Sequence, residues 1–281
     1  MADESALAGE SPPIEIDESD DEGFGAEIAS STVSLQSSVL RFEFENGRRY
    51  HASNSGMLAF PNDEDELDRM DLEGHLWLML LGGAYHLAPL QNPQKILDLG
   101  TGTGLWAISV ADMYPSAQVV GTDLSPVQPL TVPPNCEFQV DDFNQEWTWL
   151  DNAFDLIHGR LLLASVEDYS KFFRRAFAAT KPGGFFEMHD IDPGFYADDD
   201  SLPEKSSAVE WGELFKEGCA KVGRPILPVE DYRRLMEDAG FVNIREVRMK
   251  RPQNVWPKDK SMKRIGMVCT QPPCYPACVQ F

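Results

Sequence analysis

A glycine-rich turn near the middle of the chain constrains the fold more than any other feature. An apolar run over residues 96–99 is interrupted only by Asp98. Gly100, Gly102 and Gly104 then occupy alternate positions before a helix-like segment begins. Because glycine lets the backbone turn tightly and approach a ligand closely, this pattern predicts the first strand, loop and first helix of a nucleotide-binding α/β domain.

Two ligand classes compete for this loop. The dinucleotide fingerprint Gly-x-Gly-x-x-Gly holds a pyrophosphate at a helix N-terminus, and counting from Gly102 it is met only if Ala107 replaces its last glycine. The spacing Asp-x-Gly-x-Gly-x-Gly, counted from Asp98, fits better the first motif of S-adenosylmethionine-dependent methyltransferases. In that class the loop packs against the amino-acid moiety of the cofactor, and the acid accepts a hydrogen bond from its ammonium group.

Acidic residues also follow the next two predicted strands. Asp123 ends a strand predicted over Gln118–Asp123, at the position where an acid binds two ribose hydroxyls in both ligand classes. Asp141 and Asp142 follow a strand predicted over Cys136–Val140, where methyltransferases commonly place an acid that accepts from the adenine amino group, and Asp142 is the preferred candidate. A strand-end cap or a solvated loop carboxylate is the alternative interpretation of each.

Two further strands are predicted over residues 154–158 and 185–190, with His158, His189 and Asp190 at their ends. In an open parallel sheet the ligand lies beyond the carboxyl ends of the strands, so these three side chains are candidate catalytic bases beside the acids. A structural role remains the alternative for each of them. The aromatic residues at helical spacing between the two strands predict a core-facing helix.

The chain resembles the fungal LaeA-like S-adenosylmethionine-dependent methyltransferases over about residues 46–264. The resemblance rests on residues 47–52, 58–71, 97–108, 121–129, 154–160 and 181–184. It implies an α/β, Rossmann-like class I methyltransferase, with a central, mostly parallel seven-stranded sheet and helices on both faces. It also implies S-adenosylmethionine as the cofactor and an enzyme that transfers methyl groups (EC 2.1.1.-).

The motifs and the resemblance together assign the site residues. The expected cofactor-binding residues are Tyr50, Asp98, Gly100, Thr101, Gly102, Gly104, Asp123, Leu124, Asp141, Asp142, Phe143, His158 and Arg160; the expected catalytic residues are His158, His189 and Asp190. The expected substrate is a small molecule of fungal secondary metabolism. The alternative is a LaeA-like regulator that acts through a protein partner, and a dinucleotide-dependent oxidoreductase is the third hypothesis.

Four segments are expected along the chain. Residues 1–40 contain ten acidic residues and no lysine or arginine, which predicts a disordered acidic tail. Residues 41–92 are expected to form an N-terminal helical cap, with a helix over 62–87 that Asn62 caps and Gly82 and Gly83 interrupt. Residues 93–264 form the predicted S-adenosylmethionine-binding domain, and 265–281 an atypical tail rich in proline and cysteine.

The C-terminal part departs from the family pattern. A helix over 229–239 and a sixth strand over 241–249 are predicted, but the three prolines at positions 272, 273 and 276 forbid a regular helix or central strand. No candidate for the seventh strand remains, so the last strand is expected to be missing and the C-terminus shortened. Cys269, Cys274 and Cys278 lack the paired spacing of a zinc site, so no metal is expected.

Charge and hydropathy exclude other classes. The formal net charge of −22 argues against direct binding to nucleic acid. The chain has no secretory signal and no apolar run long enough to cross a membrane. We therefore expect an intracellular protein, cytoplasmic or nuclear, that does not bind membranes.

Overall fold

The computed structural model describes residues 42–51, 60–199 and 201–271. The predicted acidic tail over 1–40, Cys274 and Cys278 lie outside these residues. All elements described below belong to the compact unit Ser37–Phe281.

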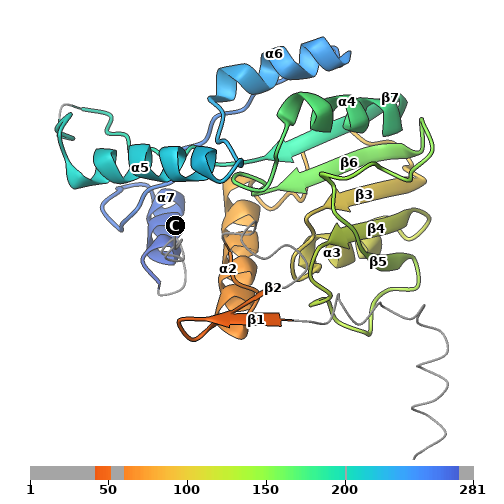
Figure 1. The fold of residues 1–281 in the computed structure, drawn as a ribbon, viewed down its shortest axis with the longest axis horizontal. Helices are drawn as coiled ribbons and strands as arrows, with labels where there is room; N and C mark the ends of the chain where they lie inside the picture. Colours follow the sequence, from red (N-terminus) through yellow and green to blue (C-terminus); the bar gives the residue numbers. More distant parts are fainter. Residues whose placement is uncertain (1–41, 52–59, 200, 272–281) are drawn as a thin grey trace, which may run out of the picture. The chain divides into compact units, whose positions relative to one another are not determined.

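A five-stranded parallel sheet forms the centre of this unit (Figure 1). Its strand order is β5-β4-β3-β6-β7, with β3 in the middle. The strands are β3 (Lys95–Leu99), β4 (Gln118–Asp123), β5 (Cys136–Val140), β6 (Phe154–Arg160) and β7 (Thr180–His189). The order reverses direction at β3, so the carboxyl ends of β3 and β6 flank a topological switch point, where open α/β sheets bind ligands. The predicted Rossmann-like class is confirmed.

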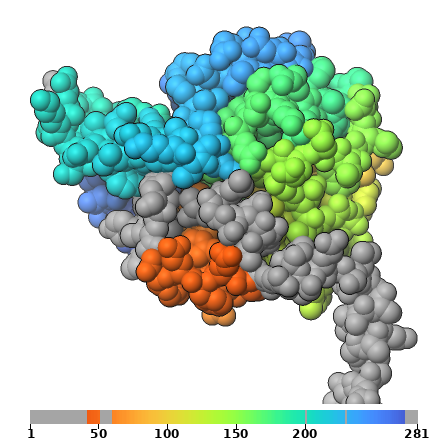
Figure 2. All heavy atoms as spheres, in the orientation of Figure 1, coloured from red at the N-terminus to blue at the C-terminus, as the bar shows by residue number. Residues whose placement is uncertain are grey.

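Alternate residues of each strand pack on opposite faces of the sheet, and helices cover both faces. Leu97 and Ile157 belong to the core shared with α4 (Tyr169–Ala179) and α6 (Val229–Ala239). Ile96 and Leu156 belong to the core shared with α3 (Leu105–Met113). Five residues at helical spacing are expected to face the core from this helix. Four of them are buried and Phe177 is 43% exposed; the buried ones are Tyr169, Phe172, Phe173 and Ala176. In the space-filling view the surfaces of α4 and α6 adjoin (Figure 2).

The N-terminal part consists of a hairpin and one long helix. Strands β1 (Phe42–Glu45) and β2 (Arg48–His51) pair in antiparallel orientation. Helix α2 (Glu64–Leu80) begins after Asp63, whose side chain accepts from the Glu66 N–H. The predicted cap Asn62 is therefore wrong by one residue, because the Asn62 amide instead donates to Ser125 Oγ at 3.2 Å. The predicted interruption at Gly82 and Gly83 is confirmed, since both have positive φ just after the helix ends.

The C-terminal part contains α5 (Ser207–Lys221), α6 and α7 (Lys260–Cys269). The predicted sixth strand over 241–249 is wrong: among the described residues the sheet ends at β7. A strand is stable only when its backbone groups pair with a neighbouring strand, and this segment has no such neighbour. Val242 is 79% exposed, so the segment also lacks the buried face of a central strand.

Candidate functional site

A cavity of about 3000 Å³ opens at the carboxyl ends of the strands and continues along β7. Most of the site residues expected from the sequence line it. They are Asp98, Gly100, Thr101, Gly102, Asp123, Leu124, Asp141, Phe143, His158, Arg160, His189 and Asp190. The strand-end argument therefore brings together side chains that lie up to 92 positions apart in the sequence (190 − 98).

Tyr50, Gly104 and Asp142 are not among the residues that line the cavity. Gly104 precedes α3 with a φ of +82°, and a Cβ there would lie 2.4 Å from Phe138 Cζ, so its role is to let the loop turn. The Asp142 carboxylate accepts from the Asn144 N–H at 2.9 Å and thus stabilises its own turn. Its neighbour Asp141, the second candidate, lines the cavity instead.

Three backbone N–H groups of the glycine loop already have partners inside the protein. The Thr101 N–H donates to the Thr122 carbonyl at 2.8 Å, and the Gly104 N–H donates to the Thr101 carbonyl at 3.0 Å. The Gly102 N–H donates to Asp123 Oδ2 at 2.8 Å. A phosphate nest needs such N–H groups free to point at the anion, so these three groups are not available to a phosphate.

The loop is instead a close-fitting wall that only glycine permits. Gly100 and Gly102 both have positive φ. A Cβ on Gly100 would lie 2.6 Å from Leu162 Cδ2, and one on Gly102 would lie 3.1 Å from Met70 Sδ. Side chains of α2 and of the segment after β6 therefore cover the loop directly.

Carboxylates follow or end three adjacent strands around this loop. Asp98 is buried, accepts from Thr101 Oγ1 at 2.6 Å, and its burial raises its pKa to about 7. Burial also raises the pKa of Asp123, although the N–H groups of Ser125 and Gly102 oppose this shift. Burial likewise raises the pKa of Asp141. Acids that accept hydrogen bonds suit a ligand that carries an ammonium group, hydroxyls and an aromatic amino group, and they would repel a pyrophosphate.

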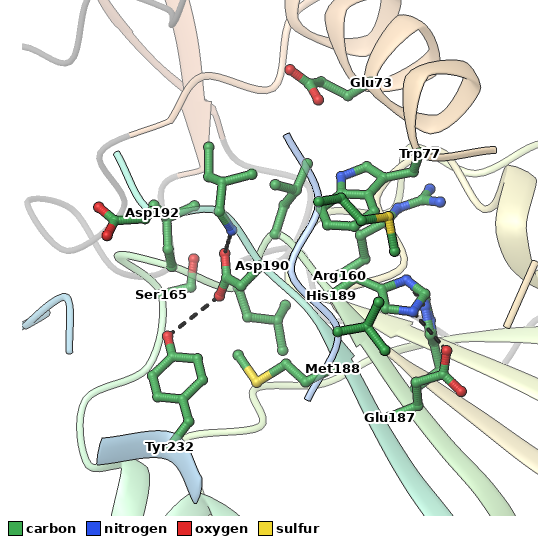
Figure 3. A pocket seen from close by; sticks show the side chains of 18 of the residues that line it. Glu73, Trp77, Arg160, Ser165, Glu187, Met188, His189, Asp190, Asp192 and Tyr232 are labelled. Carbon is green, nitrogen blue, oxygen red and sulfur yellow. Dashed lines mark hydrogen bonds and ion pairs between the residues drawn. The ribbon is translucent and has the colours of Figure 1, made fainter. Parts of the chain in front are cut away.

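The cavity also offers two hydrogen-bond donors without partners in the part of the chain that the structure describes. Arg160 makes no hydrogen bond or ion pair within the described residues, and its burial lowers the pKa of its guanidinium. Trp77 Nε1 is buried and has no partner among the described residues. A Cβ on Gly74 would lie 3.3 Å from Arg160 Nη2, and Gly74 and Trp77 lie three residues apart on one face of α2. Figure 3 shows Trp77 and Arg160 at one end of the cavity.

Asp190 occupies another part of the cavity (Figure 3). Its Oδ1 accepts from the Ile191 N–H at 3.0 Å, and its Oδ2 accepts from the Tyr232 hydroxyl at 3.5 Å. Burial raises the pKa of Asp190 to about 7. A carboxyl group with this pKa can gain or lose a proton near neutral pH.

The two candidate histidines lie in the interior rather than on an open surface. His158 is fully buried, its ring stacks on Trp106 at 3.7 Å, and its Nδ1 lies 2.7 Å from Asp98 Oδ1. His189 stacks on Trp77 at 5.2 Å. Sequence reasoning missed Trp77 and Tyr232 as site residues, because a tryptophan or tyrosine in a helix carries no signal beyond apolar periodicity.

Two further observations concern the described residues. None of the helices in residues 42–51, 60–199 and 201–271 is long and apolar enough to span a membrane. The same residues contain no group of three or more His, Cys, Asp or Glu side chains that could hold a metal ion.

Comparison with known proteins identifies the family. Residues 79–246 match the family described as "Methyltransferase domain". The chain is 38% identical over 257 residues to the "Methyltransferase pytC" of Aspergillus terreus, covering 91% of this chain and 79% of that protein. It is 38% identical over 228 residues to the "Secondary metabolism regulator LAE1" of Cochliobolus heterostrophus, covering 79% of this chain and 74% of that protein.

A third relative is the "Protein-methionine methyltransferase laeA" of Emericella nidulans, 36% identical over 245 residues, which cover 86% of this chain and 65% of that protein. The family match over residues 79–246 includes the glycine loop and the strand-end carboxylates. The predicted family is confirmed, and the oxidoreductase hypothesis is wrong. The chain belongs to the LaeA-like family of fungal S-adenosylmethionine-dependent methyltransferases.

Proposed function

We propose that this methyltransferase modifies a small molecule of fungal secondary metabolism and binds its cofactor across the carboxyl ends of β3, β4 and β5. One observation carries the proposal: Asp98, Asp123 and Asp141 surround a glycine loop in which three N–H groups have internal partners. This arrangement favours a cationic, hydroxyl-bearing ligand over a phosphate. The relative pytC, a methyltransferase by name, supports the reaction class.

Each acid has a proposed partner on the cofactor. Asp98 accepts from the ammonium group, Asp123 from the ribose hydroxyls, and Asp141 rather than Asp142 from the adenine amino group. A carboxylate offers about four acceptor sites, so the two backbone N–H groups that Asp123 already binds leave room for two hydroxyls. Leu124 and Phe143 supply apolar walls between these polar contacts.

Arg160 and Trp77 are proposed to bind the carboxylate of the cofactor. Both donors lack partners within the described residues, and a buried donor without a partner carries a desolvation cost that a ligand acceptor removes. Arg160 is also the one arginine or lysine among the site residues expected from the sequence, and its positive charge complements a carboxylate. Tyr50 and Gly104 receive no contact with the cofactor in this proposal.

The acceptor side of the cavity is proposed to lie at Asp190. The cofactor supplies an activated methyl group, so the protein's tasks are to orient the nucleophile, exclude water and accept its proton. Asp190, whose pKa burial raises to about 7, is the proposed proton acceptor, and Tyr232 orients its carboxyl group. His158 is too deeply buried to contact an acceptor and is reassigned to the support of Asp98.

A regulatory role is the second candidate, because LAE1 is named a secondary metabolism regulator. In that case the acidic segment over 1–40 is proposed to recruit a protein partner, and the chain acts in the nucleus rather than the cytoplasm. In both cases residues 41–92 are proposed to cap the cofactor-binding domain over 93–264. Metabolite profiles of a deletion strain separate the two: one lost methylated product indicates a tailoring enzyme, and many altered products indicate a regulator.

Isothermal titration of the full chain with S-adenosylhomocysteine tests the proposed site. Asp123→Ala removes two charged hydrogen bonds to the ligand, each worth about 1.5–3 kcal/mol, so the Kd is expected to rise at least about 100-fold. Asp112→Ala is the matched control, because Asp112 is exposed on α3. Asp123→Asn, with thermal unfolding of each variant, separates lost binding from lost folding.

Equal affinity of the wild type and both Asp123 variants would contradict the proposed site. NADH serves as a second ligand in the same titration. Saturable NADH binding would contradict the argument from the glycine-loop N–H groups.

A further inference from the structure

Four titratable side chains form a continuous hydrogen-bonded row across three adjacent strands. Asp98, His158 and Glu187 stand directly opposite one another on β3, β6 and β7. His189 lies two residues beyond Glu187, on the same face of β7. We call Asp98, His158, His189 and Glu187 the histidine row.

The distances along the histidine row connect each group to the next. Asp98 Oδ1 lies 2.7 Å from His158 Nδ1, and His158 Nε2 lies 3.4 Å from His189 Nδ1. His189 Nε2 lies 2.6 Å from Glu187 Oε1. The two rings meet at an interplanar angle of 79°.

The far end of the histidine row is fixed as an anion. Burial disfavours the ionised form of Glu187, but the hydrogen bond from His189 and the Leu87 and Ala88 N–H groups, each 2.7 Å away, lower its pKa to about 2. Glu187 therefore accepts the His189 Nε2–H. Burial also lowers the pKa of His158 well below its usual value, so that this ring is neutral and carries one proton.

These constraints leave two arrangements of the same three protons. In the first, Asp98 is protonated and donates to His158 Nδ1, and His158 Nε2–H donates to a neutral His189. In the second, Asp98 is ionised, His158 carries its proton on Nδ1, and His189 carries protons on both nitrogens. If His189 lost its Nδ1 proton from the second arrangement, the lone pairs of His158 Nε2 and His189 Nδ1 would face each other. Release of that proton to solvent is therefore disfavoured.

Burial and the neighbouring charges set the balance between the two arrangements. Arg160 faces the row from the end of β6, with Glu73 of α2 acting on Arg160; Asp123 faces Asp98 from β4, and His86 faces His158 from the segment before β3. Trp106 and Trp77 cover the two rings and exclude water. Outside the row, the described residues offer the buried Asp98 one side-chain donor, Thr101 Oγ1 at 2.6 Å, so an ionised carboxylate there is poorly solvated in the protein alone. A cation beside Asp98 reverses that preference.

We infer that the histidine row keeps Asp98 neutral in the ligand-free protein and ionises it when the ammonium group of the cofactor binds, by moving protons within the protein. The Asp98 O–H bond breaks as His158 Nδ1–H forms, and His158 Nε2–H breaks as His189 Nδ1–H forms. The proton thus stays on His189, beside Glu187, and none is released. His189 and Glu187 are positioning residues for Asp98, and the inference rests on the proposed cofactor site.

Proton linkage of S-adenosylhomocysteine binding tests this inference. Titrations of the full chain at about pH 6 and pH 7, each in two buffers of different ionisation enthalpy, report the protons exchanged. The wild type is expected to exchange close to none and to keep its Kd across this range. His189→Gln retains a donor to Glu187 but cannot become a cation, so Asp98 must release its proton to solvent. Its Kd is expected to rise up to about tenfold per pH unit below pH 7.

His75→Gln is the matched control, because His75 is exposed on α2, outside the histidine row. It should behave as the wild type. Glu187→Gln should follow His189→Gln, because it removes the anion that stabilises a charged His189. Release of one proton by the wild type, with the same pH dependence as His189→Gln, would overturn the inference while leaving the cofactor site intact.

Nitrogen-15 spectra of the wild-type imidazoles give a readout that does not depend on the variants. The His158 proton is expected on Nε2 in the ligand-free protein and on Nδ1 with S-adenosylhomocysteine bound. An unchanged tautomer in the presence of bound ligand would also overturn the inference. Failure of the wild type to bind the ligand would instead contradict the proposed function.

Discussion

The sheet and the segments around α2 are stabilised by different forces. The sheet is held by parallel backbone pairing and by apolar side chains that are buried completely, such as Leu97, Ile157 and Phe173. Helix α2 buries Leu76 against α7, and in addition ion pairs join it to its surroundings: Arg48–Asp63 joins it to the hairpin, and Arg251–Glu73 joins it to the irregular segment before α7. Packed apolar groups tolerate changes of pH and salt, whereas ion pairs do not, so the two regions should respond differently to the same perturbation.

The largest expected effect comes from removing a ring from the core of the sheet region, compared with a ring at its margin. Phe173 is fully buried and contacts the rings of Phe172, Phe186 and Tyr232. Phe173→Ala should lower the free energy of unfolding by about 3–5 kcal/mol, as for large core deletions. Phe241, partly exposed beside Phe186, should cost only about 1–2 kcal/mol when changed to Ala. Urea unfolding measures both, and equal losses would show that complete burial is not what stabilises the sheet region.

The same contrast explains how much the sequence could predict. Periodicity and strand ends identified β3, β4, β5, β6 and β7, because buried parallel strands need apolar runs and their carboxyl ends meet at one edge. The segment over 241–249 has the composition of a strand, but a strand also needs a partner, and pairing is not visible in a local pattern. Its exposed residues had to be found in the structure.

The site was predictable to the same extent. Asp98 and Asp123 follow from their positions at strand ends. That Asp141 rather than the preferred Asp142 lines the cavity depends on the conformation of the turn, in which the Asp142 carboxylate accepts from the Asn144 N–H. Trp77 and Arg251 belong to other elements, and their contacts arise only when distant segments pack. Part of the histidine row could be predicted from the sequence, because alternation along a strand places Glu187 and His189 on one face of β7.

Arg251 tests the contribution of charge to the region around α2. Its guanidinium lies 2.8 Å from Glu73 Oε1, and both side chains are largely buried. Among the described residues, Arg251→Met leaves the Glu73 carboxylate with one ion pair, to Arg69 Nη1 at 3.9 Å, so a loss of about 2–3 kcal/mol is expected. Arg248→Met is the control, because the exposed Arg248 pairs with Glu230 and Glu246 in solvent and should change stability by less than about 0.5 kcal/mol. A similar loss for both variants in urea unfolding would show that burial does not decide the strength of these pairs.

The smallest expected effect concerns pH and the start of α2. The hydrogen bond from Arg48 lowers the pKa of Asp63 to about 2 from its ordinary value of 3.8. Since the folded-state pKa is the lower one, the stabilisation is complete above about pH 5 and is lost as pH falls towards 2. Asp63→Asn keeps the helix cap and removes the charge, which should cost about 1–2 kcal/mol at pH 7 after allowance for partial exposure.

The difference between Asp63→Asn and the wild type should therefore shrink between about pH 5 and pH 3 in urea unfolding followed at each pH. Asp65→Asn, on the exposed side of the same helical turn, should cost only a few tenths of a kcal/mol through the helix dipole. A constant difference for Asp63→Asn across this range would assign its effect to the cap rather than to the ion pair. In that event α2 would be held, like the sheet, by contacts that pH does not change.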